Sequence, residues 1–164
     1  MRILVLGVGN ILLTDEAIGV RIVEALEQRY ILPDYVEVLD GGTAGMELLG
    51  DMADRDHLII ADAIVSRKNA PGAIMVLRDD EVPALFTNKI SPHQLGLADV
   101  LSALRFTGEF PKRLTLVGVI PESLEPHIGL TPTIEAMITP ALEQVLLALR
   151  ESGVEVIARE ETYV

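Results

Sequence analysis

The sequence predicts an α/β fold of three layers, in which a twisted, mostly parallel sheet of about five strands carries helices on both faces. Two observations predict it. Short apolar runs, typical of strands buried on both faces, alternate with longer segments whose apolar residues recur at helical spacing. That alternation is typical of strand–helix–strand units with right-handed crossovers. A chain of 164 residues is long enough for a full core, and we expect one domain over residues 1–164.

Five apolar runs are the predicted strands. The first, over residues 3–8, is uninterrupted and leads into the turn Gly7-Val-Gly-Asn10. The third, over residues 57–61, ends directly before Asp62. In chain order the strands are expected at residues 3–8, 36–39, 57–61, 73–77 and 113–119. Residues 154–157 are apolar enough to add an edge strand.

Spacing and cap residues predict the two main helix starts. Residues 15–30 carry apolar side chains at helical spacing, and Thr14 is a suitable N-cap for them. The run Ser91-Pro-His-Gln94 is a stronger start, with Ser as N-cap, Pro at the first position and Gln as capping-box partner. We expect this second helix to stop near Gly108.

The other helical segments are shorter or less regular. A short helix is predicted over residues 45–52 and a last one within 131–152. Pro140 marks either a kink in the last helix or its true start. Residues 79–90 show no clear period and are expected to be irregular.

Composition excludes several classes of protein. The absence of Cys excludes disulfides, thiolate metal sites and a cysteine nucleophile. A net charge of −12 would repel phosphate backbones, so we expect no nucleic acid as partner. The sequence shows neither a signal-peptide pattern nor an apolar run of about 18 residues, which a membrane span needs. We therefore expect a cytoplasmic protein that has no membrane partner.

Acidic and imidazole side chains follow the predicted strands at one edge of the sheet. In folds of this class ligands bind outside the carboxyl ends of the strands, so these residues are candidates for a site. They are Asp15 and Glu16 after the first strand, Asp40 after the second, Asp62 after the third, His93 after the fourth, and Glu122, Glu125 and His127 after the fifth. Acidic groups that gather in one place repel one another, and a bound cation is the simplest relief. The roles of the three residues after the fifth strand are left open.

Two of these candidates also have explanations that need no site, and two favour function. Glu16 alone is accounted for by the dipole of its helix, and an Asx turn explains Asp40 about as well as function does. Asp62 ends a buried strand and needs a partner there, so we favour function. His93 is expected near the start of its helix, where the dipole disfavours a charged ring. We therefore predict the neutral imidazole that a metal ion requires.

Two carboxylates and a neutral imidazole make a mixed oxygen and nitrogen ligand set. Such a set suits zinc, nickel, manganese or iron, and the ligand types do not select among them. Three protein ligands leave positions open for water or for groups of another molecule. A different histidine, His57, enters its strand at the opposite edge of the sheet and is expected to be structural.

The turn Gly7-Val-Gly9 after a buried strand is similar to the start of a dinucleotide-binding fingerprint. That fingerprint needs a third glycine at position 12, which is Leu12 here. The following helix begins with two carboxylates, Asp15 and Glu16, which would repel a phosphate at the helix N-terminus. A nucleotide-binding module without enzymatic activity is therefore an alternative that these residues disfavour.

Four motifs, in order and spacing, resemble those of the hydrogenase maturation endopeptidases, in particular the type that acts on hydrogenase-2 nickel–iron enzymes. They are Gly7-Val-Gly-Asn10 with Thr14-Asp-Glu-Ala-Ile-Gly19, Asp40-Gly-Gly-Thr43, Ala61-Asp-Ala63 and Ser91-Pro-His-Gln-Leu95. The resemblance covers essentially the whole domain. It implies an endopeptidase that removes a short C-terminal extension from the hydrogenase large-subunit precursor once nickel has been inserted.

The resemblance also implies roles for particular residues. Glu16, Asp62 and His93 fall on the metal-contacting positions of the family, and Asp40 falls on an acid of functional importance without an agreed role. The nickel is expected to arrive in the substrate as a recognition tag, and other divalent metals are able to occupy the same site. We consider Asp40 as a catalytic base for a positioned water. A nickel chaperone that escorts the metal without cutting is the alternative.

Overall fold

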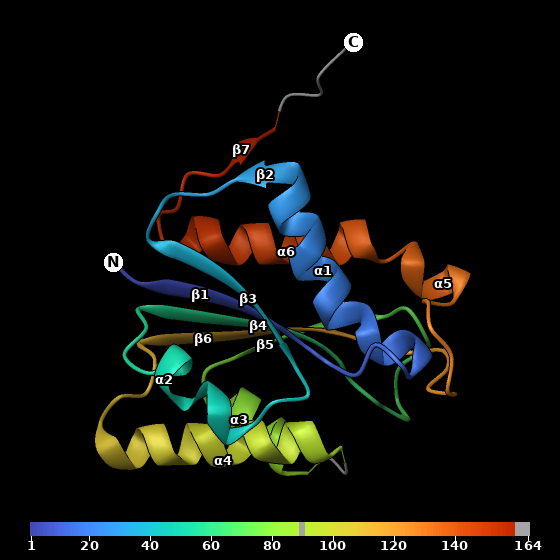
Figure 1. Cartoon of the computed structure of the whole chain (residues 1–164), viewed down its shortest axis with the longest axis horizontal. Coiled ribbons are helices and arrows are strands. Elements are labelled where there is room, and N and C mark those ends of the chain that lie inside the picture. The colour runs from blue at the N-terminus through green and yellow to red at the C-terminus, as the bar shows by residue number, and fades with distance from the viewer. Residues whose placement is uncertain (89–90, 160–164) are drawn as a thin grey trace.

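The computed structural model describes residues 1–88 and 91–159. Its centre is a five-stranded sheet in the spatial order β3-β1-β4-β6-β5, in which β5 runs antiparallel to β6 and the other pairs are parallel (Figure 1). The strands are β1 (Ile3–Val8), β3 (Val36–Gly42), β4 (His57–Ala63), β5 (Ile74–Arg78) and β6 (Arg113–Val119). They match the five predicted strands, and the α/β class is confirmed.

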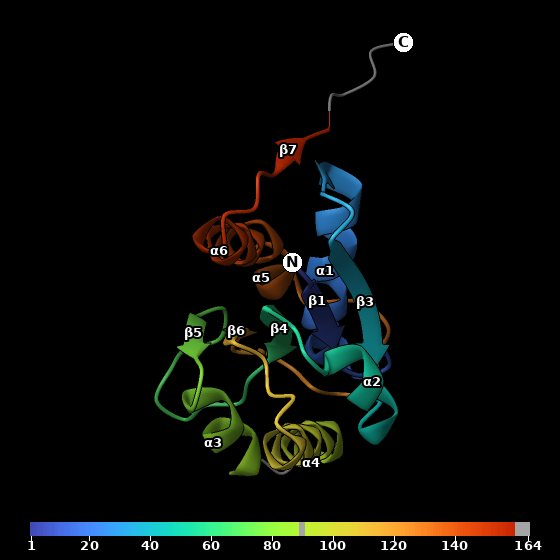
Figure 2. The same cartoon turned by 90° about the vertical axis from the view of Figure 1, so that its left-hand side faces the viewer.

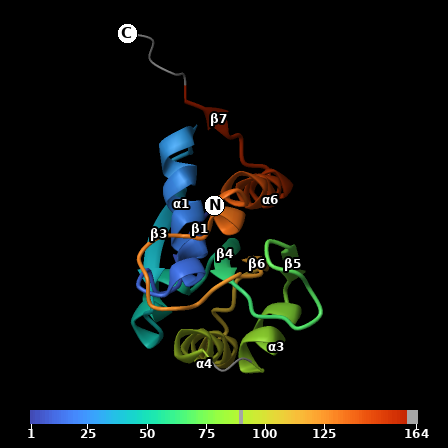
Figure 3. The same ribbon diagram turned by 90° about the vertical axis from the view of Figure 1, so that its right-hand side faces the viewer.

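Helices cover both faces of this sheet, so the predicted three layers are also confirmed. On one face lie α1 (Ile18–Arg29) and α6 (Ile138–Glu151), and on the other lie α2 (Leu49–Met52), α3 (Glu81–Thr87) and α4 (Pro92–Thr107) (Figures 2 and 3). Short elements complete the chain: the 3-10 turns η1 (Thr14–Ala17) and η2 (Met46–Leu48), the helix α5 (Pro132–Glu135), and the strands β2 (Tyr30–Ile31) and β7 (Ile157–Ala158). No helix of the described residues is long and apolar enough to cross a bilayer.

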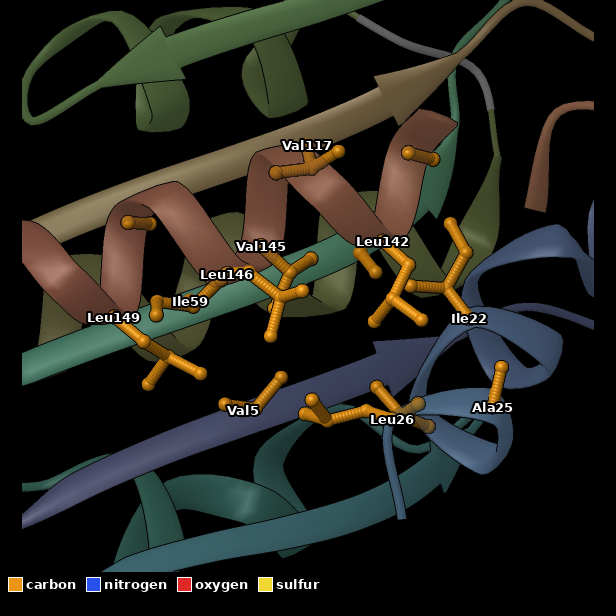
Figure 4. Packing of buried hydrophobic residues seen from close by; sticks show 14 of the residues in the cluster. Val5, Ile22, Ala25, Leu26, Ile59, Val117, Leu142, Val145, Leu146 and Leu149 are labelled. Carbon is orange, nitrogen blue, oxygen red and sulfur yellow. The ribbon is translucent and has the colours of Figure 1, made fainter. Parts of the chain in front are cut away.

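Two apolar clusters, one on each face of the sheet, hold the layers together. Because side chains alternate along a strand, Val5 of β1 faces the layer of α1 and α6, whereas its neighbours Leu4 and Leu6 face the layer of α2, α3 and α4. Figure 4 shows the first cluster, where Leu26 of α1 and Val145 of α6 meet the strand side chains. Full burial of such side chains stabilises the fold by about 1.5–3 kcal/mol each.

The first helix begins later than predicted. Thr14 is not its N-cap: its φ of 51° lies in the left-handed region, and its hydroxyl donates to the carbonyl of Glu125. Residues 14–17 form a 3-10 turn, and α1 follows from Ile18. A contact to a loop more than a hundred residues away determines this start, and local sequence does not reveal it.

Three further predictions need correction. Residues 81–87, expected to be irregular, form α3, because Pro83 stands in the first helical turn, where its missing N–H costs nothing. Residues 89–90 of that predicted stretch lie outside the described part of the chain. The expected edge strand at 154–157 is instead a two-residue pairing of β7 with β2, apart from the main sheet. Pro140 lies in the first turn of α6, which begins two residues earlier, at Ile138, so the proline is close to the true start of the last helix but is not its first residue.

Candidate active site

Three of the predicted site residues meet at the carboxyl edge of the sheet. Glu16 lies in η1, directly after β1, and Asp62 is the next-to-last residue of β4. His93 is the second residue of α4. The crossover topology brings these segments together although they are 31 to 77 positions apart in the sequence.

The His93 ring lies between the two carboxylates. Its Nδ1 is 3.2 Å from Glu16 Oε1, and its Nε2 is 3.3 Å from each oxygen of Asp62. Burial alone would favour a neutral ring, but hydrogen bonds and charge from Asp62 and Glu16 outweigh it and raise the pKa of His93 to about 9. The prediction of a neutral imidazole is therefore wrong for the metal-free chain, because two carboxylates outweigh the dipole of one helix.

Asp62 is fully buried and has several donors. Its Oδ1 accepts from the backbone N–H of Ala63 at 2.8 Å, and its Oδ2 accepts from Gln94 Nε2 at 2.8 Å. Burial raises the pKa of Asp62, although the hydrogen bonds from His93 and Gln94 oppose that shift. The pair of Asp62 and His93 thus holds on to a proton, which a metal ion has to displace when it binds.

The predicted capping residues of α4 serve the site instead. Ser91 has the extended backbone of an N-cap, yet its hydroxyl lies 2.7 Å from His93 Nδ1 and makes no cap hydrogen bond. Gln94 donates to Asp62 Oδ2 and to the carbonyl of Ala63 rather than back to the helix start. Sequence reasoning missed both roles. The available signal was that these two polar residues flank a candidate ligand, His93.

The glycines of the first turn allow close backbone packing. Gly9 has a φ of +136°, and a Cβ at this position would lie 1.9 Å from the carbonyl oxygen of Glu16. The same turn directs the backbone N–H of Asn10 to Glu16 Oε1 at 3.2 Å. The space that a phosphate would need above Gly9 is therefore filled by the chain itself, which disfavours the nucleotide-binding alternative.

Asp15 does not join the site, although it is adjacent to Glu16. Its buried carboxylate accepts from the backbone N–H groups of Glu122, Ser123 and Thr131 at 2.8–2.9 Å. It thereby fixes the loop between β6 and α5. Of the two acids at this helix start, one holds a loop and only Glu16 contacts His93.

The remaining candidates make no hydrogen bond or ion pair with Glu16, Asp62 or His93 in the described part of the chain. Asp40 is exposed at the end of β3, and its Oδ1 accepts from the N–H of Gly42 at 2.9 Å, as in an Asx turn. The side chains of Glu122, Glu125 and His127 are exposed.

A cleft of about 1190 Å³ opens beside the site. Glu16, His93 and Gln94 form part of its wall, whereas Asp62 lies behind them, out of contact with solvent. The remaining lining includes the apolar residues Leu13, Met46, Val65 and Leu124 and the basic residues Arg67 and Lys68. This volume exceeds that of most small-molecule pockets and suits a segment of polypeptide.

The donor set fits a divalent cation in chemistry but is not fully arranged for one. Metal bonds of about 2.1 Å in a tetrahedral site place two ligand atoms about 3.4 Å apart, close to the 3.3 Å between His93 Nε2 and Asp62. Glu16 faces the other ring nitrogen. Accordingly, no group of three His, Cys, Asp or Glu residues in the described chain is arranged to hold a metal ion. Either Glu16 or the His93 ring has to reorient before all three contact one ion.

Comparisons with known proteins identify the family. Residues 20–148 match the family model described as hydrogenase maturation protease. The chain is 92% identical over 160 residues to the hydrogenase 2 maturation protease of Escherichia coli strain K12, with 98% of each chain covered. It is 48% identical to the hydrogenase expression/formation protein HupD of Rhizobium leguminosarum bv. viciae, over 98% of this chain and 80% of that protein.

Solved structures give the same result. The hydrogenase maturating endopeptidase HybD from E. coli matches with a TM-score of 0.95 at 92% identity, covering 97% of this chain and 98% of that one. The [NiFe] hydrogenase maturation protease HybD from Thermococcus kodakarensis matches with a TM-score of 0.74 at 25% identity, covering 90% and 99%. The chain therefore belongs to the hydrogenase maturation proteases and is a hydrolase that acts as an endopeptidase.

Proposed function

We propose that this endopeptidase removes a C-terminal extension from a nickel-loaded hydrogenase large-subunit precursor, and that Glu16, Asp62 and His93 recognise the nickel. The observation that carries the proposal is the His93 ring, held between two carboxylates at 3.2 and 3.3 Å in the wall of a cleft of about 1190 Å³. This is a compact group of oxygen and nitrogen donors placed where a polypeptide can reach it. The nickel belongs to the substrate and is not a resident cofactor.

The metal-free arrangement supplies a physical basis for discrimination. Without nickel, the charges of Glu16 and Asp62 are balanced by the His93 imidazolium. A precursor without nickel brings no cation that could replace the proton of His93. A divalent ion displaces this proton and binds the carboxylates and the imidazole. Only the loaded precursor therefore gains contacts with these three residues.

The cleavage step needs a water molecule against the scissile carbonyl and a group that accepts its proton. We assign this base to Asp40, at the carboxyl end of β3. Its carboxylate is exposed and accepts a hydrogen bond from the backbone N–H of Gly42. The site at Glu16, Asp62 and His93 has a positioning role in this scheme, because it fixes the precursor relative to Asp40.

The deciding experiment compares two forms of one precursor. The purified protease is incubated with nickel-loaded and with nickel-free large-subunit precursor, and the intact mass of each is followed over time. We expect the loaded form to lose its C-terminal extension and the empty form to keep it. Equal cleavage of both forms would overturn nickel recognition. An unchanged mass together with transfer of nickel to the protease would instead support a nickel chaperone.

A further inference from the structure

The side-chain amide of Gln94 contacts Asp62 directly. Gln94 is only 5% exposed, and its Nε2 donates to Asp62 Oδ2 at 2.8 Å and to the carbonyl oxygen of Ala63 at 3.0 Å. Both hydrogens of the amide nitrogen are therefore engaged at the end of β4. A glutamine of the first turn of α4 thus connects the helix that carries His93 to the strand that carries Asp62.

Asp62 is held at both of its oxygens. Oδ2 accepts from Gln94, and Oδ1 accepts from the backbone N–H of Ala63 at 2.8 Å. Each carboxylate oxygen has two lone pairs, so one remains on each. His93 Nε2 lies at the same distance, 3.3 Å, from both oxygens, so both oxygens face one point, which this nitrogen occupies in the metal-free chain. A carboxylate fixed in this way presents both oxygens to whatever occupies that point.

We propose that Gln94 is a positioning residue for nickel recognition: it holds Asp62 so that both oxygens face the ion carried by the substrate. This inference rests on the proposed function. Groups that orient metal ligands in this manner change metal affinity or activity by about 10–100-fold when they are removed. The neutral amide suits the task because it donates to Asp62 without adding charge, whereas a Glu here would place another carboxylate against Asp62.

A purely structural role for Gln94 predicts a different outcome. If its hydrogen bonds only stabilise the junction of α4 and β4, a variant loses stability, and the molecules that remain folded bind metal normally. A positioning role predicts that the folded variant itself binds metal more weakly. Nickel affinity of the folded chain therefore separates the two, and thermal unfolding measured in parallel gives the folded fraction.

The test uses Gln94→Met, which keeps the length of the side chain and removes both donors. Nickel chloride is titrated by calorimetry into the wild-type chain, into Gln94→Met and into the control Gln144→Met, which changes a half-exposed glutamine of α6. We expect nickel binding about 10–100-fold weaker for Gln94→Met and unchanged for the control. The same variant should raise the KM for nickel-loaded precursor more than it lowers kcat.

The outcomes separate this inference from the proposed function. Wild-type-like nickel affinity in folded Gln94→Met overturns the positioning role alone. No nickel binding by the wild-type chain at millimolar concentration, or equal cleavage of loaded and empty precursor, overturns the proposed function as well. If Gln94→Met does not fold, Gln94→Asn replaces it, since its amide is one methylene too short to reach Asp62. Wild-type affinity of Gln94→Asn then overturns the inference.

Discussion

The two ends of strand β4 carry buried side chains of opposite character. At its start, His57 is 1% exposed and lies between two hydroxyls, Ser152 Oγ at 2.6 Å and Thr115 Oγ1 at 2.8 Å. At its other end, Asp62 faces His93, a second buried histidine. Burial, with Arg113 nearby, lowers the pKa of His57 to about 4, whereas the pKa of His93 is raised to about 9.

The difference shows that burial does not decide the charge of a histidine; its partners do. Burial favours the neutral ring at both ends of β4. Hydroxyls satisfy His57 without charge, so the ring stays neutral and serves the fold, as the sequence predicted. The carboxylates of Asp62 and Glu16 stabilise a proton on His93 that a divalent cation is able to displace. The histidine at the amino edge of the sheet therefore serves the fold, whereas the one at the carboxyl edge holds a proton between two carboxylates.

The largest expected effect comes from removing charge or ligand strength at the carboxyl edge. Glu16→Gln, Asp62→Asn and His93→Gln keep the approximate size of each side chain. We expect each to lower kcat/KM for nickel-loaded precursor by about 100-fold or more, since each removes a group that the proposed function places in contact with the ion. His57→Gln, at the other end of β4, is the control and should stay within about threefold of wild type. Normal cleavage by any of the three site variants contradicts the proposed function.

A second large effect is expected at Asp40. Asp40→Asn removes the charge but keeps an oxygen that accepts from the N–H of Gly42, so the turn is preserved. If Asp40 is the base, kcat falls about 100-fold with little change in KM, because general-base catalysis contributes about 10²–10⁴. Steady-state kinetics on nickel-loaded precursor measure both constants. A kcat within a few-fold of wild type would exclude Asp40 as the base and mean that its carboxylate only stabilises the turn.

A third prediction concerns the neighbours Asp15 and Glu16, which differ in their partners. Asp15→Asn replaces a buried carboxylate, which accepts from three backbone N–H groups, by an amide with only one acceptor oxygen. We expect a loss of about 2–4 kcal/mol in unfolding free energy. Glu16→Gln should change stability by less than about 1 kcal/mol. Urea unfolding of both variants checks this. A loss for Asp15→Asn as small as the one expected for Glu16→Gln would mean that the loop after β6 does not depend on Asp15.

The sequence was sufficient for the sheet and for the central residues of the candidate site. Apolar runs with clear boundaries predicted all five strands of the main sheet, because burial on both faces leaves a strong local pattern. The parallel strands β1 and β4 place Glu16 and Asp62 at one edge, as predicted. His93 reaches the same edge by another route, because β5 runs antiparallel and ends at the opposite edge, and the chain returns through α3 to the start of α4. These are properties of single segments and of chain order, which the sequence contains directly.

What the sequence did not predict depends on contacts between distant segments. The start of α1 depends on the contact of Thr14 with Glu125, and the neutral ring expected for His93 became charged because of two acids from other elements. Ser91 and Gln94 form a good capping pattern, yet stronger partners from the site engage both side chains. A local pattern identifies a possible hydrogen bond, but competition among partners in the fold decides which one forms.

The smallest predicted effect is a pH dependence that differs between the two histidines. The folded pKa of His57, about 4, lies below the unfolded value near 6.5, so the unfolded chain takes up the proton first. The contribution of His57 to stability is therefore complete above pH 6.5 and is lost as the pH falls toward 4. The folded pKa of His93, about 9, lies above the unfolded value. Its contribution is complete below pH 6.5 and is lost as the pH rises through 9.

Two variants separate these opposite slopes in the metal-free chain. His57→Gln should flatten the acid side of the plot of stability against pH, by roughly 1 kcal/mol between pH 6.5 and 4, and leave the alkaline side unchanged. Asp62→Asn should flatten the alkaline side, because His93 loses the carboxylate that contributes most to its raised pKa. Unfolding free energies measured from pH 4 to 10 test both. If Asp62→Asn leaves the slope of unfolding free energy against pH unchanged on the alkaline side, Asp62 does not hold the proton on His93. The contrast between His57 and His93 then has another cause.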